Sequence, residues 1–276
     1  MKRIAGLLIL SAFLAAPSLA FAEGQPAGIY IAPKFVYGAT WMNKFGVDGV
    51  PYAGGGNYVP IPDDKSDTKI GGALAIGYDF GKQTKAPVRF ELEYSMFSAT
   101  SAEEPLYGSK VEWSLSTGGF VDPVRFSAKQ RMKMQTLFVN AYYDFRNDTP
   151  FSFWLGAGAG VALIESKGNF AIHIPEDNYA FGSALGVNDG PAYTEYWSAG
   201  SKRTKNFAWN VGAGVGYDLT SNLTLDIGYR FASLGRAETE SGRGAFMYIM
   251  SGGLDQTAKV KQIYMHQFML GLRVTF

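Results

Sequence analysis

The chain has 276 residues, of which 47% are hydrophobic and only 18% charged, and its 25 basic residues are balanced by 24 acidic ones. This composition excludes a disordered tail, and the near-neutral charge argues against nucleic acid as a partner. The absence of cysteine excludes a disulfide scaffold, a thiolate metal site and a thiol enzyme, while 34 glycines beside 20 Phe, 16 Tyr and 5 Trp form an unusual mixture for a soluble enzyme.

The first 22 residues have the three parts of a secretory signal peptide. Lys2 and Arg3 form a positive start, residues 4–14 form an apolar stretch, and residues 20–22 read Ala-Phe-Ala, an A-x-A cleavage site. We therefore expect export and cleavage after Ala22, which leaves residues 23–276 as the mature domain. No cysteine follows the apolar stretch, which excludes a lipid-anchored lipoprotein.

The mature sequence has the pattern of strands rather than of membrane-spanning helices. No apolar run after Ala22 reaches the roughly 18 residues that such a helix needs. Apolar residues recur instead at every second position, which gives a strand two unlike faces. This pattern predicts eight strands of about the length that crosses a bilayer, at residues 29–40, 69–80, 88–97, 134–145, 151–164, 206–219, 223–233 and 264–276.

The links between these segments alternate in length. Short links cover residues 81–87, 146–150 and 220–222, and long ones cover about 42–68, 98–133, 165–205 and 234–260. Short periplasmic turns alternating with long extracellular loops are typical of outer-membrane barrels. The predicted fold is therefore all-β, an eight-stranded antiparallel up-and-down transmembrane barrel with four long extracellular loops.

Charged residues of the predicted strands lie on the face opposite the large apolar residues. An outward base at the bilayer midplane would cost about 2–4 kcal/mol, so the apolar face should meet lipid and the charged face the barrel interior. An unpaired buried charge is costly, which leads us to expect a salt-bridge network in the lumen. Its predicted members are Arg89, Glu91, Glu93, Asp226, Arg230 and Arg273. Eight strands enclose a space that side chains can fill, which favours a closed barrel over an open pore.

Several stretches resemble a known family. The alternating residues before the C-terminal Phe276, the stretch Asn140–Phe145, the glycine repeat of 156–160 and Ile227–Phe231 are similar to those of opacity-type, OmpA-like and surface-antigen barrels of bacterial outer membranes. The resemblance covers the eight strands and none of the long loops. It implies that some relatives act as adhesins or stabilise the envelope, and that a C-terminal signature presents the chain to the barrel assembly machinery. That signature is Phe268, Leu270, Leu272, Val274 and Phe276. The peptidoglycan-binding domain of OmpA does not follow, which argues against cell-wall anchoring.

The sequence leaves two other kinds of function open, an enzyme and a porin. His266 near the outer rim and Ser233 on the neighbouring strand could form a lipid-modifying enzyme, but neither strand supplies an acidic residue to orient the histidine, and His173 lies alone in a long loop. A narrow or gated porin is the other alternative. We expect instead a non-enzymatic protein without cofactor or metal, which serves surface display, adhesion or envelope integrity. Its expected partners are outer-membrane lipid and lipopolysaccharide, the assembly machinery, and a host or surface ligand of the loops.

Overall fold

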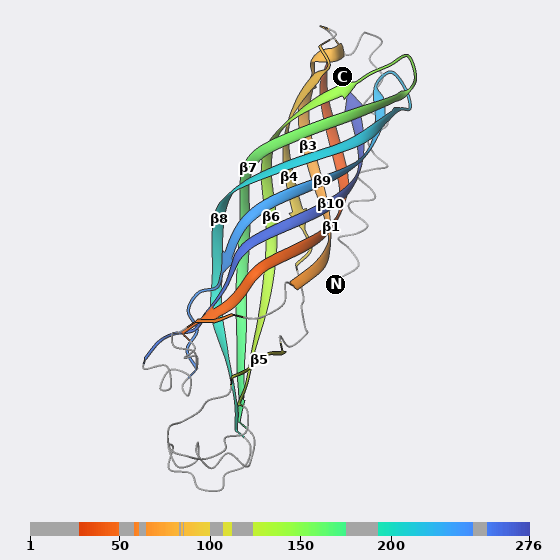
Figure 1. Cartoon of the computed structure of the whole chain (residues 1–276). Helices are drawn as coiled ribbons and strands as arrows, with labels where there is room; N and C mark the ends of the chain where they lie inside the picture. The colour runs from red at the N-terminus through yellow and green to blue at the C-terminus, as the bar shows by residue number, and fades with distance from the viewer. Residues whose placement is uncertain are drawn as a thin grey trace, which may run out of the picture.

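The protein is a closed antiparallel β-barrel (Figure 1). A computed structural model describes residues 28–49, 58–60, 65–82, 84, 86–99, 107–111, 124–174, 193–244 and 253–276. Eight long strands form the barrel: β1 (Ile29–Asp48), β3 (Lys65–Asp79), β4 (Val88–Phe97), β6 (Val124–Phe145), β7 (Phe151–Ile174), β8 (Tyr193–Asp218), β9 (Leu223–Glu238) and β10 (Thr257–Thr275). Two short strands, β2 (Tyr58–Pro60) and β5 (Tyr107–Val111), pair with β1 and β6, and a 3-10 turn, η2 (Phe80–Lys82), follows β3.

Each long strand pairs with its neighbours in chain order, and β1 pairs with β10 to close the cylinder. The closing seam runs from Tyr30 opposite Thr275 to Asp48 opposite Thr257. Because the sheet closes on itself, the long strands leave no unpaired edge in the lipid. The predicted fold class is confirmed. No helix in the described part of the chain is long and apolar enough to cross a bilayer.

We call the part of the barrel next to the short turns the lower half and the part beyond it the upper half, although the short turns are drawn at the top of Figure 1. The outer surface of the lower half is apolar, as the alternating pattern predicts. Leu74, Leu92, Val139, Leu155 and Ile227 are 46–59% exposed although they are aliphatic, which is expected where lipid rather than water is the surroundings. The C-terminal segment follows this face only in part, since Phe268, Leu270 and Phe276 are exposed, Leu272 is half-buried and Val274 is buried. Val274 lies between Ile31 and Leu223 of the adjoining strands.

The four long loops predicted from the sequence include many residues that belong to strands in the structure. Strand β6 already begins at Val124, β7 continues to Ile174, and β8 begins at Tyr193, so strand occupies much of the spans 98–133 and 165–205. In the same way β1 and β3 enter the span 42–68, and β9 and β10 enter the span 234–260. Figure 1, which is drawn with the short turns at the top, shows β6, β7 and β8 continuing together well past the other strands at the bottom of the picture. The signal-peptide residues 1–22 lie outside the described residues.

The boundaries of β6, β7 and β8 differ from the predicted ones because the two faces of each of these three strands exchange character along its length. On β6 the outward residues of the lower half include Leu137 and Val139, whereas those of the upper half include Arg131 and Lys133. The inward residues change in the opposite sense, from Asn140 and Asp144 to the buried Met132 and Met134. The prediction requires apolar residues on the outer face along the whole strand. It therefore ends each of these strands at the first outward charged residue, although the strand continues.

Small residues make room for large ones in the lower interior. A Cβ atom added at Gly214 or Gly228 would come within 2.3–2.4 Å of the Trp154 ring, and one added at Gly156 within 2.3 Å of Tyr142. Trp154 and Tyr142 in turn pack edge to face, with ring centroids 5.3 Å apart. The inward glycines therefore supply the space in which the aromatic and charged side chains of the lumen fit.

Candidate functional site: the barrel interior and its extracellular extension

The middle of the barrel interior holds a charge-balanced cluster of two acids and two bases, which we call the middle cluster. Lys34 Nζ lies 2.5 Å from Glu91 and 2.7 Å from Glu93, and Arg230 Nη2 lies 2.7 Å from Glu93. All four side chains are 10% exposed or less. Arg230 Nε also donates to the side-chain oxygen of Gln267 at 2.6 Å. Ion pairing removes most of the cost of burying these four charges.

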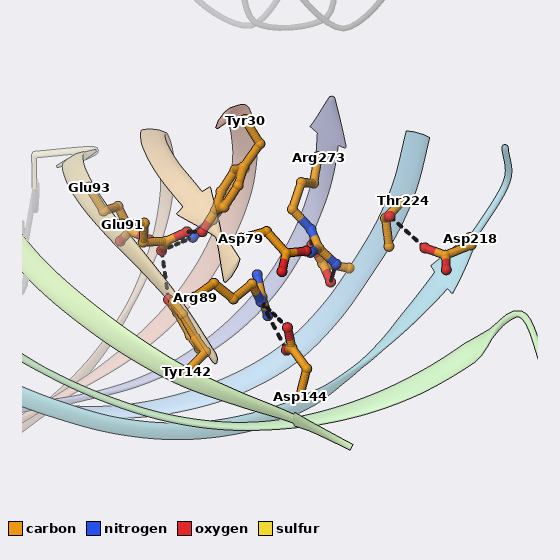
Figure 2. Close-up of polar contacts among 12 residues, drawn as sticks. Tyr30, Asp79, Arg89, Glu91, Glu93, Tyr142, Asp144, Asp218, Thr224 and Arg273 are labelled. Atoms are coloured by element: carbon orange, nitrogen blue, oxygen red, sulfur yellow. Dashed lines mark hydrogen bonds and ion pairs between the residues drawn. The ribbon is translucent and has the colours of Figure 1, made fainter. Parts of the chain in front are cut away.

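Neutral polar groups complete the surroundings of Glu91. Its carboxylate accepts hydrogen bonds from the Tyr142 hydroxyl at 2.6 Å and the Tyr30 hydroxyl at 3.2 Å (Figure 2), and from the Asn140 amide at 3.2 Å. These donors come from β1 and β6, while Glu91 lies on β4. The cluster therefore joins strands from across the barrel and favours one register.

A second balanced cluster, the turn-end cluster, lies nearer the short turns. Its three acids and three bases are Asp79, Asp144, Asp226, Arg89, Arg146 and Arg273. Arg89 Nε lies 2.9 Å from both oxygens of Asp144 (Figure 2), and Arg273 Nε lies 3.1 Å from Asp226. Arg146, just after β6, donates to Asp79 at 2.6 Å and to Asp144 at 3.1 Å. Arg146 thereby covers the cluster from the turn side.

The six residues expected to form one network belong to two clusters in the structure. It brings Arg230 to Glu93 and Arg273 to Asp226, whereas Arg89 pairs with Asp144 rather than with any of the other five. Sequence reasoning missed Lys34, which shares Glu91 and Glu93. The inward position of Lys34 in the strand predicted at residues 29–40 was a usable signal, and so were the inward positions of Asp79 and Asp144 in the strands predicted at 69–80 and 134–145.

Above the middle cluster the interior becomes mainly apolar. Buried Val36, Phe138, Ile164, Ala208 and Met265 project inward from five strands and fill the barrel. The cavities below them are small. One of about 20 Å³ lies between the clusters, beside Lys34 and Arg89, and one of about 110 Å³ opens beside Asp144 and Arg146 at the turn end. A space of about 20 Å³ accommodates a single water molecule.

The barrel continues beyond the apolar belt as a structured extension. Strands β6, β7 and β8 have 22, 24 and 26 residues, whereas a tilted strand crosses a bilayer in about 9–11. Within the extension the rings of Phe170 and Trp197 stack with centroids 5.6 Å apart, and both are buried. Tyr196, the neighbour of Trp197, is 79% exposed on the outer side.

His266 and Ser233 do not come together as a catalytic pair. His266 Nδ1 lies 2.5 Å from the Tyr229 hydroxyl, and its ring packs against Trp41 and Phe231 in an aromatic group at the outer edge of the belt. Ser233 instead accepts a hydrogen bond from Gln262 at 2.8 Å. His173 lies in β7 and not in a loop, opposite Arg125 and Thr194. Among the residues that the structure describes, no group of three or more potential ligands could hold a metal ion.

Comparison with known families decides the family of the chain. The model for the outer membrane protein beta-barrel domain matches residues 6–276. The chain belongs to this family. It is therefore a protein of the cell outer membrane, as the signal sequence and the alternating pattern predicted.

The chain is also similar to individual proteins of bacteria. Outer membrane protein PagN of Salmonella typhimurium is 30% identical over 213 residues, which cover 76% of this chain and 75% of PagN. A candidate adhesin of Rickettsia bellii is 22% identical over 175 residues, 63% of each chain, and the opacity protein opA60 of Neisseria gonorrhoeae is 29% identical over 110 residues, 38% of this chain and 45% of opA60. The resemblance to small surface barrels is confirmed.

Proposed function

We propose that this barrel is a non-enzymatic adhesion or display protein, which binds a surface ligand through its extracellular extension. The length of β6, β7 and β8 carries the proposal, because about half of each strand stands beyond the apolar belt. Membrane anchoring does not require this length. The exposed Tyr196 near the far end is the type of side chain that dominates binding surfaces. The Rickettsia relative named as a candidate adhesin supports the same role.

The interior supports a closed barrel rather than a narrow porin. An ion moving through the lumen would have to break two neutral ion clusters and then cross the apolar layer that contains Phe138 and Met265. We therefore propose that both clusters serve to specify strand packing and register. Buried ionic groups have this role in some proteins at little net gain in stability.

The two ends of the sequence carry proposals of their own. Residues 1–22 would be removed on export, with cleavage after Ala22. The alternating residues of β10 that end at Phe276 would be read by the assembly machinery of the outer membrane. Exchange of Phe276 for serine should then slow insertion while the purified chain still folds in detergent.

Adhesion is tested by shortening the β7–β8 hairpin. Residues 167–201 are replaced by Asn-Gly, which joins Ser166 to Lys202, a pair already in register. Bacteria that display this variant should lose binding to cultured host cells, while unboiled samples of the variant should still migrate faster on gels than boiled ones, as expected of a folded barrel. Retained binding would contradict the proposal. Single-channel steps from the intact protein in planar bilayers would favour the porin alternative, and a changed lipid A profile the enzyme alternative.

A further inference from the structure

The outer surface just above the apolar belt carries a dense group of bases on three adjacent strands, which we call the basic patch. Its members are Arg131 and Lys133 on β6, Lys167 on β7, and Arg203 and Lys205 on β8, and all five are exposed. Arg131 lies opposite Lys167, and Lys133 and Arg203 both lie opposite Glu165. Neighbouring strands are about 4.8 Å apart, so the patch spans about 10 Å across the barrel wall.

One acid lies within the patch and is already engaged. Glu165 accepts a hydrogen bond from Ser201 at 2.9 Å and lies 3.6 Å from Arg203. Among the described residues, no carboxylate is within ion-pair distance of the other four bases. The patch therefore has a net charge of about +4, which an anionic partner could neutralise.

The position of the patch relative to the belt indicates where that partner lies. Leu137, Val161 and Phe207 form the last apolar row of these strands, and they are 42–73% exposed. Lys205 comes two residues above this row, Lys133 and Arg203 come four residues above it, and Arg131 and Lys167 come six residues above it. At about 3.4 Å per residue on a tilted strand, the charged groups lie roughly 5–14 Å beyond the hydrocarbon, at the depth of lipid headgroups.

The rest of the barrel wall differs at this depth. On β3 and β4 the outward residues above the belt are the uncharged Ser66, Thr68 and Ser98. Strands β1, β9 and β10 carry scattered exposed bases, Lys44, Arg236 and Lys261. A bare requirement for snorkelling lysines would distribute them evenly around the barrel. The concentration on β6–β8 instead indicates one preferred binding position.

We propose that the basic patch binds the phosphorylated headgroup of an outer-leaflet glycolipid, with its acyl chains lying along Leu137, Val161 and Phe207. Two phosphates on a sugar headgroup match several bases spread over about 10 Å, and acyl chains match the exposed apolar row directly below. A soluble polyanion would match the bases but would leave that row unused. This site is independent of the adhesive role proposed above.

The test compares two variants with the same loss of charge. Lys133→Gln/Lys167→Gln/Lys205→Gln removes three bases from the patch, and Lys44→Gln/Arg236→Gln/Lys261→Gln removes three exposed bases outside it. Native mass spectrometry of the folded barrel in detergent measures retention of bis-phosphorylated lipid A, of the same lipid A without phosphates, and of phosphatidylglycerol. Unchanged gel migration before boiling shows that each variant folds.

The intact protein should retain one bis-phosphorylated lipid A in preference to the other two lipids. The patch variant should bind it about 100-fold more weakly, which corresponds to about 1 kcal/mol per lysine, and the control variant should stay within about threefold of the intact protein. Equal losses in the two variants would overturn the proposal, as would equal retention of dephosphorylated lipid A or phosphatidylglycerol.

Discussion

The lower and upper halves of strands β6, β7 and β8 have opposite arrangements of polarity. In the lower half apolar side chains such as Val139 face outward, and ionised ones such as Asp144 are buried inside. In the upper half bases such as Lys133 face outward, and Met132 and Phe170 are buried inside. The pairing of β6 with β7 continues without interruption between the halves, and that of β7 with β8 has one irregularity, between Ser166 and Gly168 in the upper half.

The difference shows that the surroundings, rather than the strand itself, decide which face is apolar. Where lipid covers the wall, burial of polar groups inside is the solution that leaves no charge in hydrocarbon. Where water covers it, the interior is a mainly hydrophobic core, with a few buried polar side chains such as Gln130 and Ser166, which hydrogen-bond to each other. The reversal falls between Leu137 and Lys133 on β6 and between Phe207 and Lys205 on β8, which marks the outer membrane surface.

The largest effect is expected from breaking the ionic interior of the lower half. Glu93→Gln removes the acid shared by Lys34 and Arg230, and uncompensated buried charge costs about 3–5 kcal/mol. Urea unfolding in detergent, followed by tryptophan fluorescence, should show this loss. The control Glu165→Gln, an acid of the extension, should leave the midpoint unchanged. A midpoint for Glu93→Gln equal to that of the intact protein would show that the middle cluster is not needed for stability.

A charge on the outside should be harmful in the lower half and harmless in the upper. Val139→Lys places a base on the lipid face and should cost about 2–4 kcal/mol. The matched reverse exchange, Lys133→Val, lies six residues away on the same face of β6 and should stay within about 0.5 kcal/mol of the intact protein. The same unfolding measurement in liposomes compares the two, and similar costs would contradict the assignment of the membrane surface.

The interior of the upper half should respond to substitution as the core of a soluble protein does. Ile164→Val removes one methyl group from a fully buried side chain and should cost about 0.5–1.5 kcal/mol. Hydrogen exchange of the β7 and β8 amides beyond Ile164 provides a local measurement. Unchanged protection there would mean that the extension is not held together by its core.

The smallest effect concerns an exposed ion pair of the extension. The hydrogen bond from Lys202, 2.6 Å from Glu238, holds the pKa of that carboxyl below its usual value of 4.5. Its contribution to stability is present above the usual pKa and is lost as the pH falls through the lowered one. NMR titration should place the Glu238 midpoint below 4.5 in the intact protein, and Lys202→Gln should raise it. Identical midpoints would show that the pair does not form in solution.

Most of the membrane-embedded barrel could be predicted from the sequence. When a strand with a two-residue period carries charges on one face only, that face must point to the interior and the other face to lipid. The observed ion pairs of Arg230 with Glu93 and of Arg273 with Asp226 join residues that were predicted to face the interior. Prediction of Lys34 and Asp144 as ion-pair partners would have required knowledge of which strands face each other across the lumen. The extension could not be predicted in this way. Arg131 and Lys133 on the outer face end the pattern of a lipid-facing strand, but they are normal on a strand that is surrounded by water.

Cysteine scanning of β6 tests the reversal of polarity most directly, since the chain contains no cysteine of its own. Spin labels are attached singly at residues 131–143 in lipid bilayers, and their accessibility to oxygen and to a water-soluble nickel complex is measured. Labels at 137, 139 and 143 should be reached by oxygen and those at 131 and 133 by nickel, while labels at 132, 134, 138 and 140 should be reached by neither. Nickel access at 137 and 139, or oxygen access at 131 and 133, would contradict the membrane boundary and with it the two-halved barrel.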